Sequence, residues 1–217
     1  MPRNTIVYVD GFNLYYGLVK GTPYKWLDLE ALCRRVLPLE HHRVIKIKYF
    51  TALVTPRPDD PQTAIRQQLY LRALRTSPII EIILGHFLVH PVRLPLAIPP
   101  ATGQRTVEVL RSEEKGSDVN IASHLLCDAF DNAFEAAVLI SNDSDLVLPI
   151  QIVREKFGRV VGVLNPHPEA DAVQLKHTAT FIKPIRAAAA KFSQFPRFLT
   201  DSHGRFERPA KWTNTHG

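Results

Sequence analysis

Cysteine is scarce in this sequence, and the usual signals of secretion or membrane insertion are missing. The 217 residues contain 2 cysteines, Cys33 and Cys127, and neither stands in a C-x-x-C motif. This argues against a disulfide framework and favours two buried free thiols. No stretch of about eighteen apolar residues occurs, so we expect no transmembrane helix. The amino terminus enters a strand-like run without the shape of a signal peptide, which predicts a cytoplasmic protein.

Three familiar motifs of phosphate chemistry are also lacking. The sequence has no P-loop, no glycine-rich dinucleotide fingerprint and no early D-x-D nucleophile motif. These absences argue against other phosphate-handling enzymes, such as a phosphatase. What is present is an ordinary globular balance, with 45% apolar and 22% charged residues.

The net charge of +6 is confined to one end of the chain. Residues 1–175 hold 19 Lys and Arg against 19 Asp and Glu, which cancel. Residues 176–217 hold 8 against 2, which accounts for the whole excess. A basic carboxyl-terminal segment favours a polyanionic partner, although a merely solvated tail would carry the same charge.

Short apolar runs alternate with stretches of helical spacing along the chain. The strand-like runs are residues 5–9, 43–54, 79–84, 136–140 and 159–164. Helical spacing is found at residues 27–37, 61–75, 118–134 and 144–157. Fully apolar strands that alternate with helices predict an α/β fold with a parallel sheet covered on both faces. Two further extended segments, around residues 86–111, predict an insertion or hairpin at the sheet edge.

Acidic residues follow two of these strands and open one helix. Asp10 ends the first strand, Asp143 and Asp145 follow the strand 136–140, and Asp118 begins a helix. In such sheets ligands bind beyond the carboxyl ends of the strands, near the point where the strand order reverses. We therefore expect these carboxylates to meet at one site.

Carboxylates gathered in this way repel one another, and a divalent cation would remove that cost. Mg²⁺ and Mn²⁺ prefer hard oxygen ligands and retain several waters. Such an ion can polarise a phosphoryl oxygen and activate a water for in-line attack. Asn13, Ser141, Asn142 and Ser144 would supply neutral hydrogen bonds to carboxylates or phosphate oxygens.

Each acid also has a simpler interpretation. Asp143 or Ser144 could cap the following helix, and Asp118 could interact only with a helix dipole. The D-G-F-N sequence after the first strand could form only a turn. These simpler interpretations explain the three sites less well together than singly, because three acidic strand or helix ends would have to occur together by chance.

Three motifs together resemble a known family. They read YVDGFNLYYG (Tyr8–Gly17), EEKGSDVNIASHLL (Glu113–Leu126) and LISNDSDLVLPI (Leu139–Ile150). In this order they resemble the NYN domain family of PIN-like nucleases, and RVVGVLNP extends the likeness to about residue 166. The resemblance implies a PIN-like three-layer α/β fold with a central parallel β-sheet of order 3-2-1-4-5 and helices on both faces. It also implies an endoribonuclease that hydrolyses RNA phosphodiester bonds with Mg²⁺ or Mn²⁺.

The resemblance extends to individual residues. It assigns catalysis and the metal to four aspartates: Asp10, Asp118, Asp143 and Asp145. Candidate substrate contacts are Asn13, Lys115, Ser141 and Asn142. One position departs from the family, since members often have Asp where this chain has His124, which leaves the number of metal ions open. The alternative function is a nucleic-acid-binding or regulatory NYN domain with weak or no catalysis.

The expected partner is RNA, single-stranded, approaching through a groove with basic or polar walls. Candidate groove residues are Lys20, Lys115, Arg66, Arg72 and Arg75. The helix arginines could equally form a solvated outer face. Of Tyr15 and Tyr16, which could stack on bases or pack in the core, we expect one to be buried. No membrane contact is expected, and a homo-oligomer is compatible with the sequence.

We predict two parts of the chain. Residues 1–183 form an NYN/PIN-like nuclease domain, and residues 184–217 form a basic carboxyl-terminal extension that contains aromatic side chains. The extension interleaves Lys and Arg with Phe and Trp, a composition that suits single-stranded nucleic acid. Aromatic residues could instead dock the segment onto the body. We expect residues up to about Leu199 to pack, and Thr200–Gly217 to be mobile and electrostatic in effect.

Overall fold

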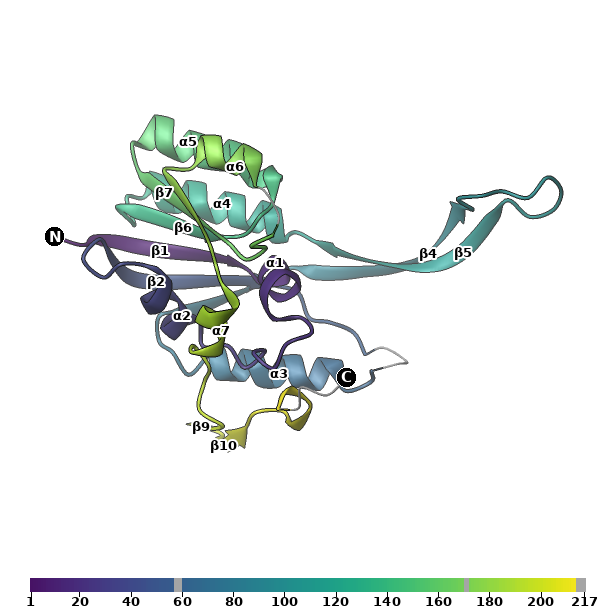
Figure 1. The fold of residues 1–217 in the computed structure, drawn as a ribbon, viewed down its shortest axis with the longest axis horizontal. Helices are drawn as coiled ribbons and strands as arrows, with labels where there is room; N and C mark the ends of the chain where they lie inside the picture. Colours follow the sequence, from purple (N-terminus) through teal and green to yellow (C-terminus); the bar gives the residue numbers. More distant parts are fainter. Residues whose placement is uncertain (57–59, 170–171, 214–217) are drawn as a thin grey trace.

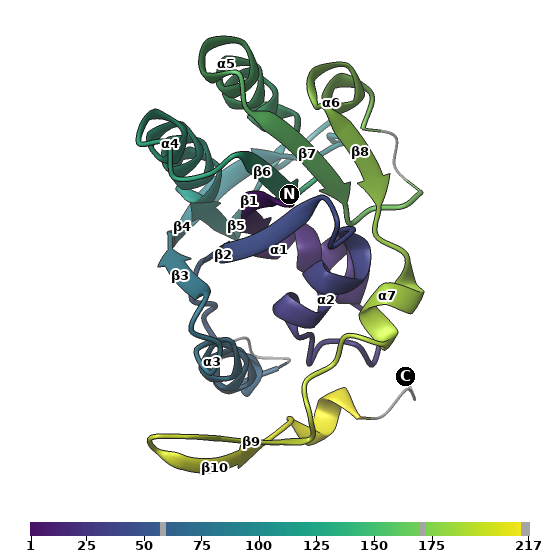
Figure 2. The same ribbon diagram turned by 90° about the vertical axis from the view of Figure 1, so that its left-hand side faces the viewer.

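A computed structural model describes residues 1–56, 60–169 and 172–213 of the chain. Six parallel strands form its central sheet in the order β3-β2-β1-β6-β7-β8 (Figure 2). They are β1 (Arg3–Asp10), β2 (His42–Thr51), β3 (Ile80–Leu84), β6 (Ala136–Ile140), β7 (Val160–Asn165) and β8 (Phe181–Pro184). The first five of these follow the predicted order 3-2-1-4-5, and β8 adds a sixth at the edge.

Helices cover both faces of the sheet, as predicted, and give the fold three layers (Figure 2). One face carries α4 (Ser117–Phe130), α5 (Val147–Phe157) and α6 (Val173–Thr178), with the 3₁₀ turn η2 (Ser144–Leu146) before α5. The other carries α1 (Gly11–Leu14), the π-helical turn η1 (Tyr15–Val19), α2 (Leu29–Val36), α3 (Thr63–Leu74) and α7 (Ala187–Lys191). Because side chains alternate along a strand, β1 places Val7 and Val9 in one apolar core and Ile6 and Tyr8 in the other.

A long hairpin arm leaves the body beyond the carboxyl ends of the strands (Figure 1). It consists of β4 (His86–Pro95) and β5 (Thr106–Lys115), which pair without a break from His86 opposite Lys115 to Pro95 opposite Thr106. The predicted hairpin is confirmed, but its predicted place at the sheet edge is wrong, because the two strands form a separate sheet. Only Gly85 separates β3 from β4, so the chain runs on past the end of β2 and pairs with β5.

The carboxyl-terminal extension wraps around Trp26, whose side chain is fully buried. After α7 it forms the hairpin β9 (Phe198–Asp201) and β10 (Gly204–Glu207) and the 3₁₀ turn η3 (Ala210–Trp212). Phe195, Phe206 and Trp212 place their ring centroids 5.9, 6.4 and 6.1 Å from that of Trp26. The Trp26 indole N–H donates to the Pro196 carbonyl at 2.9 Å. The extension therefore completes one of the two cores.

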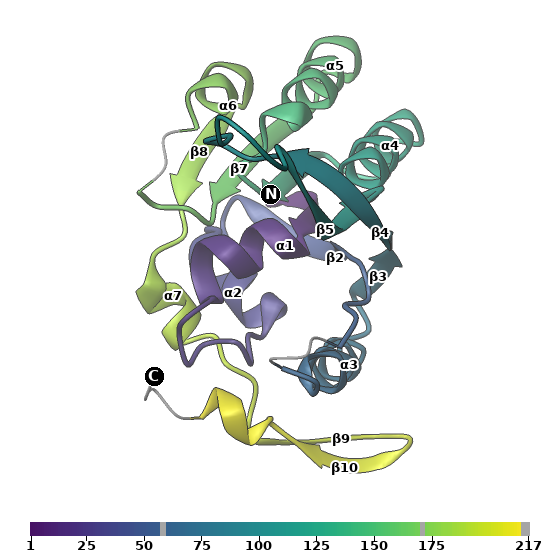
Figure 3. The same cartoon turned by 90° about the vertical axis from the view of Figure 1, so that its right-hand side faces the viewer.

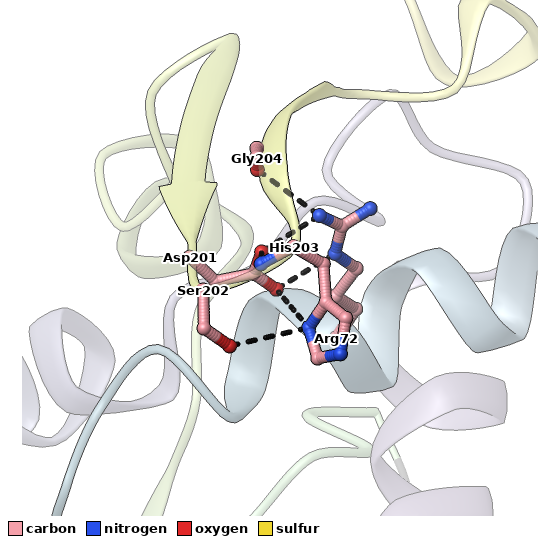
Figure 4. A network of polar contacts seen from close by, with 5 residues as sticks. All are labelled: Arg72, Asp201, Ser202, His203 and Gly204. Atoms are coloured by element: carbon pink, nitrogen blue, oxygen red, sulfur yellow. Dashed lines mark hydrogen bonds and ion pairs between the residues drawn. The ribbon is translucent and has the colours of Figure 1, made fainter.

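Polar contacts fix the same hairpin to α3 (Figure 4). Arg72 donates from Nε and Nη2 to the two carboxylate oxygens of Asp201, each at 2.7 Å, and to the Gly204 carbonyl at 3.0 Å. The hydrogen bonds from Arg72 hold the pKa of Asp201 well below its ordinary value. The Asp201 carboxylate also accepts from the backbone N–H of His203 at 2.8 Å.

These contacts correct two predictions. The expectation of a mobile segment is wrong for Thr200–Thr213, because its aromatic residues have a buried partner in Trp26; residues 214–217 lie outside the described part. Arg66 and Arg72, named as candidates for a groove, instead form ion pairs with Asp60 and Asp201. The division of the chain at residue 183 stays a prediction.

The two cysteines differ in their surroundings. Cys33 is buried, and this burial raises the pKa of its thiol to about 12. Cys127 is exposed, contrary to prediction, because it lies on the outer side of α4. Over the described residues, none of the helices combines the length and the apolar character needed to cross a membrane.

Candidate active site

The predicted acids lie where the chain reverses its direction of travel across the sheet. From β1 the chain adds β2 and β3 on one side and, after the arm, β6 and β7 on the other. The carboxyl ends of β1 and β6 are therefore the switch point of the sheet, a usual place for ligands. Figure 3 views the molecule from this end, with α1 and the arm toward the reader.

Asp10 is the most deeply buried of the acids, with 5% of its surface exposed. It is the last residue of β1 and caps α1, since its Oδ1 accepts from the Asn13 N–H at 2.9 Å. Its Oδ2 accepts from the Ser141 hydroxyl at 3.2 Å. Both carboxylate oxygens are thus oriented by neighbouring groups.

The loop after β6 is tied to Asp10 through Ser141. The Ser141 Oγ accepts from the Asp143 N–H at 3.1 Å while donating to Asp10. Asp143 in turn caps η2, accepting from the Asp145 N–H at 2.9 Å. The simpler interpretation as a helix cap is therefore correct for Asp143. Asp10, considered only as part of a turn, also caps a helix. Both caps coexist with a place at the site.

A second link joins the two motifs through amide side chains. Asn13 accepts from the Asn142 N–H at 3.0 Å. Asn142 Oδ1 is buried and has no hydrogen-bond partner among the described residues. Together with the Ser141 bridge, this contact holds the loop after β6 and the start of α1 in one arrangement.

A cavity of about 330 Å³ opens at this point. Its lining combines three carboxylates, two small polar groups and three rings: Asp10, Asp118, Asp143, Asn13, Ser117, Phe12, Tyr16 and His167. The carboxylates come from three separate elements, namely the end of β1, the first turn of α4 and the start of η2. The fold therefore brings together acids that lie far apart in the sequence. Ser141, which is hydrogen-bonded to Asp10, lies 131 residues after it in the chain.

The remaining predicted residues lie outside the lining. Asp145 is exposed, and Ser141 and Asn142 form the links just described without lining the cavity. Lys115 is exposed at the end of β5, two residues before α4 begins. The metal, catalytic and substrate roles assigned to these residues stay predictions.

Sequence reasoning missed three residues of the lining, Phe12, Ser117 and His167, whereas Tyr16 was already a candidate for stacking on bases. Ser117 and Phe12 stand beside motif acids, so proximity in sequence was an available signal. His167 follows β7 between two prolines and has no such neighbour. The expectation that one of Tyr15 and Tyr16 is buried is wrong, since they are 38% and 50% exposed. Both lie in η1, a short turn on the surface of the fold.

The donor chemistry of the lining suits a hard cation, because carboxylate, amide and hydroxyl oxygens prevail. Within the described part of the chain, no group of three or more His, Cys, Asp or Glu side chains is arranged so that it could hold a metal ion by itself. An ion bound by these residues would therefore have to keep water ligands or take further oxygens from a substrate, as Mg²⁺ can. The residues of the lining do not form a closed cage.

His124 belongs to a part-buried polar network beside the core that contains Ile6 and Tyr8. Its Nδ1 lies 3.2 Å from Lys48 Nζ, which donates to Asp128 at 2.6 Å. The Tyr8 hydroxyl donates to the same carboxylate at 2.7 Å. Burial, with the contact to Asp128, raises the pKa of Tyr8 well above its ordinary value. The departure from the family at this position therefore places an imidazole against a buried ammonium group.

Comparison with known proteins agrees with this architecture. The sequence model of the NYN domain matches residues 4–186. The 6-hydroxy-3-succinoylpyridine 3-monooxygenase HspA of Pseudomonas putida is 32% identical, over 76% of this chain and 60% of that protein, so the chain spans less than two thirds of its relative. A protein of unknown function from Vibrio parahaemolyticus has a similar fold, with a TM-score of 0.56 and 17% identity over 85% of this chain and 94% of that chain. Because the family match covers most of its length, this protein belongs to the NYN domain family.

Proposed function

We propose that the protein is a Mg²⁺- or Mn²⁺-dependent endoribonuclease that hydrolyses RNA phosphodiester bonds. The observation that carries the proposal is the convergence of Asp10, Asp118 and Asp143 on one cavity at the switch point of the sheet. Membership of the NYN domain family, a PIN-like nuclease family, supports the reaction class. Carboxylates that line one cavity can bind a divalent ion that keeps water ligands and takes further oxygens from the substrate.

In this proposal the protein's own groups hold and orient the reacting parts. Asp10, Asp118 and Asp143 would hold the cation, and Asp145 would contact either the ion or its waters. Ser141 fixes the carboxylate of Asp10 and the backbone of Asp143 together. The bound ion would polarise a phosphoryl oxygen and lower the pKa of a water.

The tested variants are Asp10→Asn and Asp143→Asn, which keep size and remove one charge each. Asp131→Asn is a matched control, because Asp131 is an exposed aspartate at the other end of α4. Cleavage is measured on single-stranded RNA, structured RNA and DNA, with and without Mn²⁺. We expect both site variants to lose at least about a hundredfold in rate, roughly 2.7 kcal/mol, and the control to lose nothing. An Asp143→Asn protein that cleaves at the wild-type rate would refute the proposal.

The alternative is a nucleic-acid-binding or regulatory domain without catalysis. The same experiment separates the two functions. RNA that is bound with measurable affinity, yet stays intact with Mg²⁺ and Mn²⁺ alike, would establish the alternative.

A second candidate function follows from the relative named as a monooxygenase of a substituted pyridine. The rings of Phe12, Tyr16 and His167 around the cavity could bind a small aromatic heterocycle. The test is oxidation of NADH in the presence of O₂, a flavin and hydroxypyridines. Turnover that responds to the pyridine, in a protein that leaves RNA intact, would favour this function over the nuclease.

A further inference from the structure

The cavity that holds the acids is also lined by three rings. Tyr16 is half exposed, and Phe12 and His167 complete the ring-bearing part of the lining. Among the described residues that line the cavity, none is Lys or Arg. Without a bound metal ion, a phosphate would meet three carboxylates there and no positively charged side chain of the lining. The rings are therefore the groups that could attract a substrate into this cavity without relying on its charge.

Each ring is held by a different part of the fold. The Phe12 ring packs edge-on against Phe87 of the arm, with centroids 5.5 Å apart and an interplanar angle of 84°. The Tyr16 ring contacts the neighbouring Tyr15 ring at 5.3 Å and 83°. These contacts position the rings before any ligand arrives, which lowers the entropy lost on binding.

His167 is held both through its backbone and through its ring. Its N–H donates to Asn165 Oδ1 at 2.8 Å, and Asn165 is buried at the end of β7. Its ring lies against Gly17, where an added Cβ would come within 2.5 Å of the imidazole Cδ2. Glycine at position 17 is thus what leaves room for the imidazole in this place.

The ammonium group of Lys20 lies next to one of the three rings. Lys20 Nζ lies 4.5 Å from the centroid of the Tyr16 ring. Lys20 is exposed and belongs to the turn that follows η1. An RNA strand that placed one base in the cavity would bring the adjoining phosphate near the Tyr16 ring, where the Lys20 ammonium group can bind it.

We propose that the ring-bearing side of this cavity is a subsite for one unpaired nucleobase, with Tyr16 and His167 against its face and Lys20 on an adjoining phosphate, while the carboxylate side holds the cation. The inference rests on the proposed nuclease function and specifies its substrate as RNA with an unstacked base at the site of cleavage. A cavity of about 330 Å³ is at the small end of the range for ligand sites and is large enough for one nucleobase. Proteins read RNA in this way where bases are free to leave the helix and stack on side chains.

The experiment measures binding separately from cleavage. The Asp143→Asn protein, in Mg²⁺, is mixed with short single-stranded RNAs that carry 2-aminopurine at one position each, and with the matching duplexes. Stacking of the probe on a ring quenches its fluorescence. We expect quenching at one position of the single strand and none in the duplex.

Variants then test the individual rings in the same background. Tyr16→Ala should bind the single strand roughly 5- to 150-fold more weakly, the range for loss of one base–aromatic contact, and should lose the quenching. His167→Ala should weaken binding in the same direction. Phe130→Ala is the matched control, because Phe130 is a 74% exposed ring at the far end of α4, and its affinity should equal that of the parent.

The outcomes separate this inference from the nuclease proposal. Tight binding without quenching, or a Tyr16→Ala protein with parental affinity and quenching, would overturn the base subsite while wild-type cleavage still stood. Quenching that depends on Tyr16, in a wild-type protein that never cleaves RNA, would support the subsite and refute the nuclease. A failure to bind single-stranded RNA in any condition would overturn the subsite.

Discussion

Replacing Phe206 by alanine should lower the free energy of unfolding by about 3 kcal/mol. The Phe206 side chain is 7% exposed, and its ring packs against Trp26 with centroids 6.4 Å apart. The Arg72 guanidinium lies 4.1 Å from the centroid of the same ring. Truncation of a buried phenylalanine to alanine costs roughly 3 to 5 kcal/mol. The lower end applies because Phe206 lies in the outer layer of its core, where neighbours can relax into the space.

The assay is equilibrium unfolding in urea, followed by tryptophan fluorescence. The chain has 2 tryptophans, Trp26 and Trp212, and their rings lie 6.1 Å apart in this same cluster. The emission therefore reports directly on the region that is changed. With an m-value of about 1 to 3 kcal/mol/M, the midpoint should fall by roughly 1 to 3 M urea.

Phe198→Ala is the matched control. Phe198 lies in the same hairpin, opposite Glu207, but is 42% exposed and contacts mainly cations, with Arg205 3.9 Å from its ring centroid. Its loss should change the free energy of unfolding by less than about 1 kcal/mol. Equal midpoints for wild type and Phe206→Ala would refute the conclusion that the extension completes the core.

Three further predictions concern the ion pairs and the cavity wall. The pKa of Asp201 is lowered mainly by its hydrogen bonds from Arg72, so its carboxylate stabilises the fold above about pH 4 and loses this effect as the pH falls further. The difference in Tm between wild type and Arg72→Met should therefore shrink from about pH 5 to pH 2. Lys48→Met should destabilise the protein by roughly 3 kcal/mol in urea unfolding, because it leaves a part-buried carboxylate unpaired, and adding Asp128→Asn should restore part of the loss. Gly17→Ala should displace the imidazole that lines the cavity, seen as shifted NMR signals of that ring, with the Tm lowered by a few degrees.

The parts of the fold that the sequence predicted are those with local signals. The strands β1 and β6 contain continuous apolar runs, whereas β2 alternates before it ends in apolar residues, and the alternation of strands with helices determines the parallel sheet. The acids at strand ends could be placed at one site because the geometry of parallel sheets brings carboxyl ends together. Burial of Asp10 and its two hydrogen bonds then refine a position that was already expected.

The parts that were missed depend on contacts between distant residues. The strand β8 has only 4 residues, too few to show a period. The extension was expected to be mobile beyond Leu199 because its charges are visible in the sequence, whereas its partner Trp26 lies far away along the chain. His167 was missed for the same reason, since its place depends on a glycine in another element.

The cover over Trp26 has a consequence for synthesis. The indole is made early, whereas the carbonyl that accepts its N–H belongs to a residue 170 positions later. At about 5 to 20 residues per second, a ribosome takes roughly 10 to 30 seconds to supply that partner. Until then one of the two cores lacks an outer wall, so the nascent chain presents an aromatic surface to chaperones. A chain that stopped before Pro196 would leave that surface exposed although the six strands of the central sheet were all present.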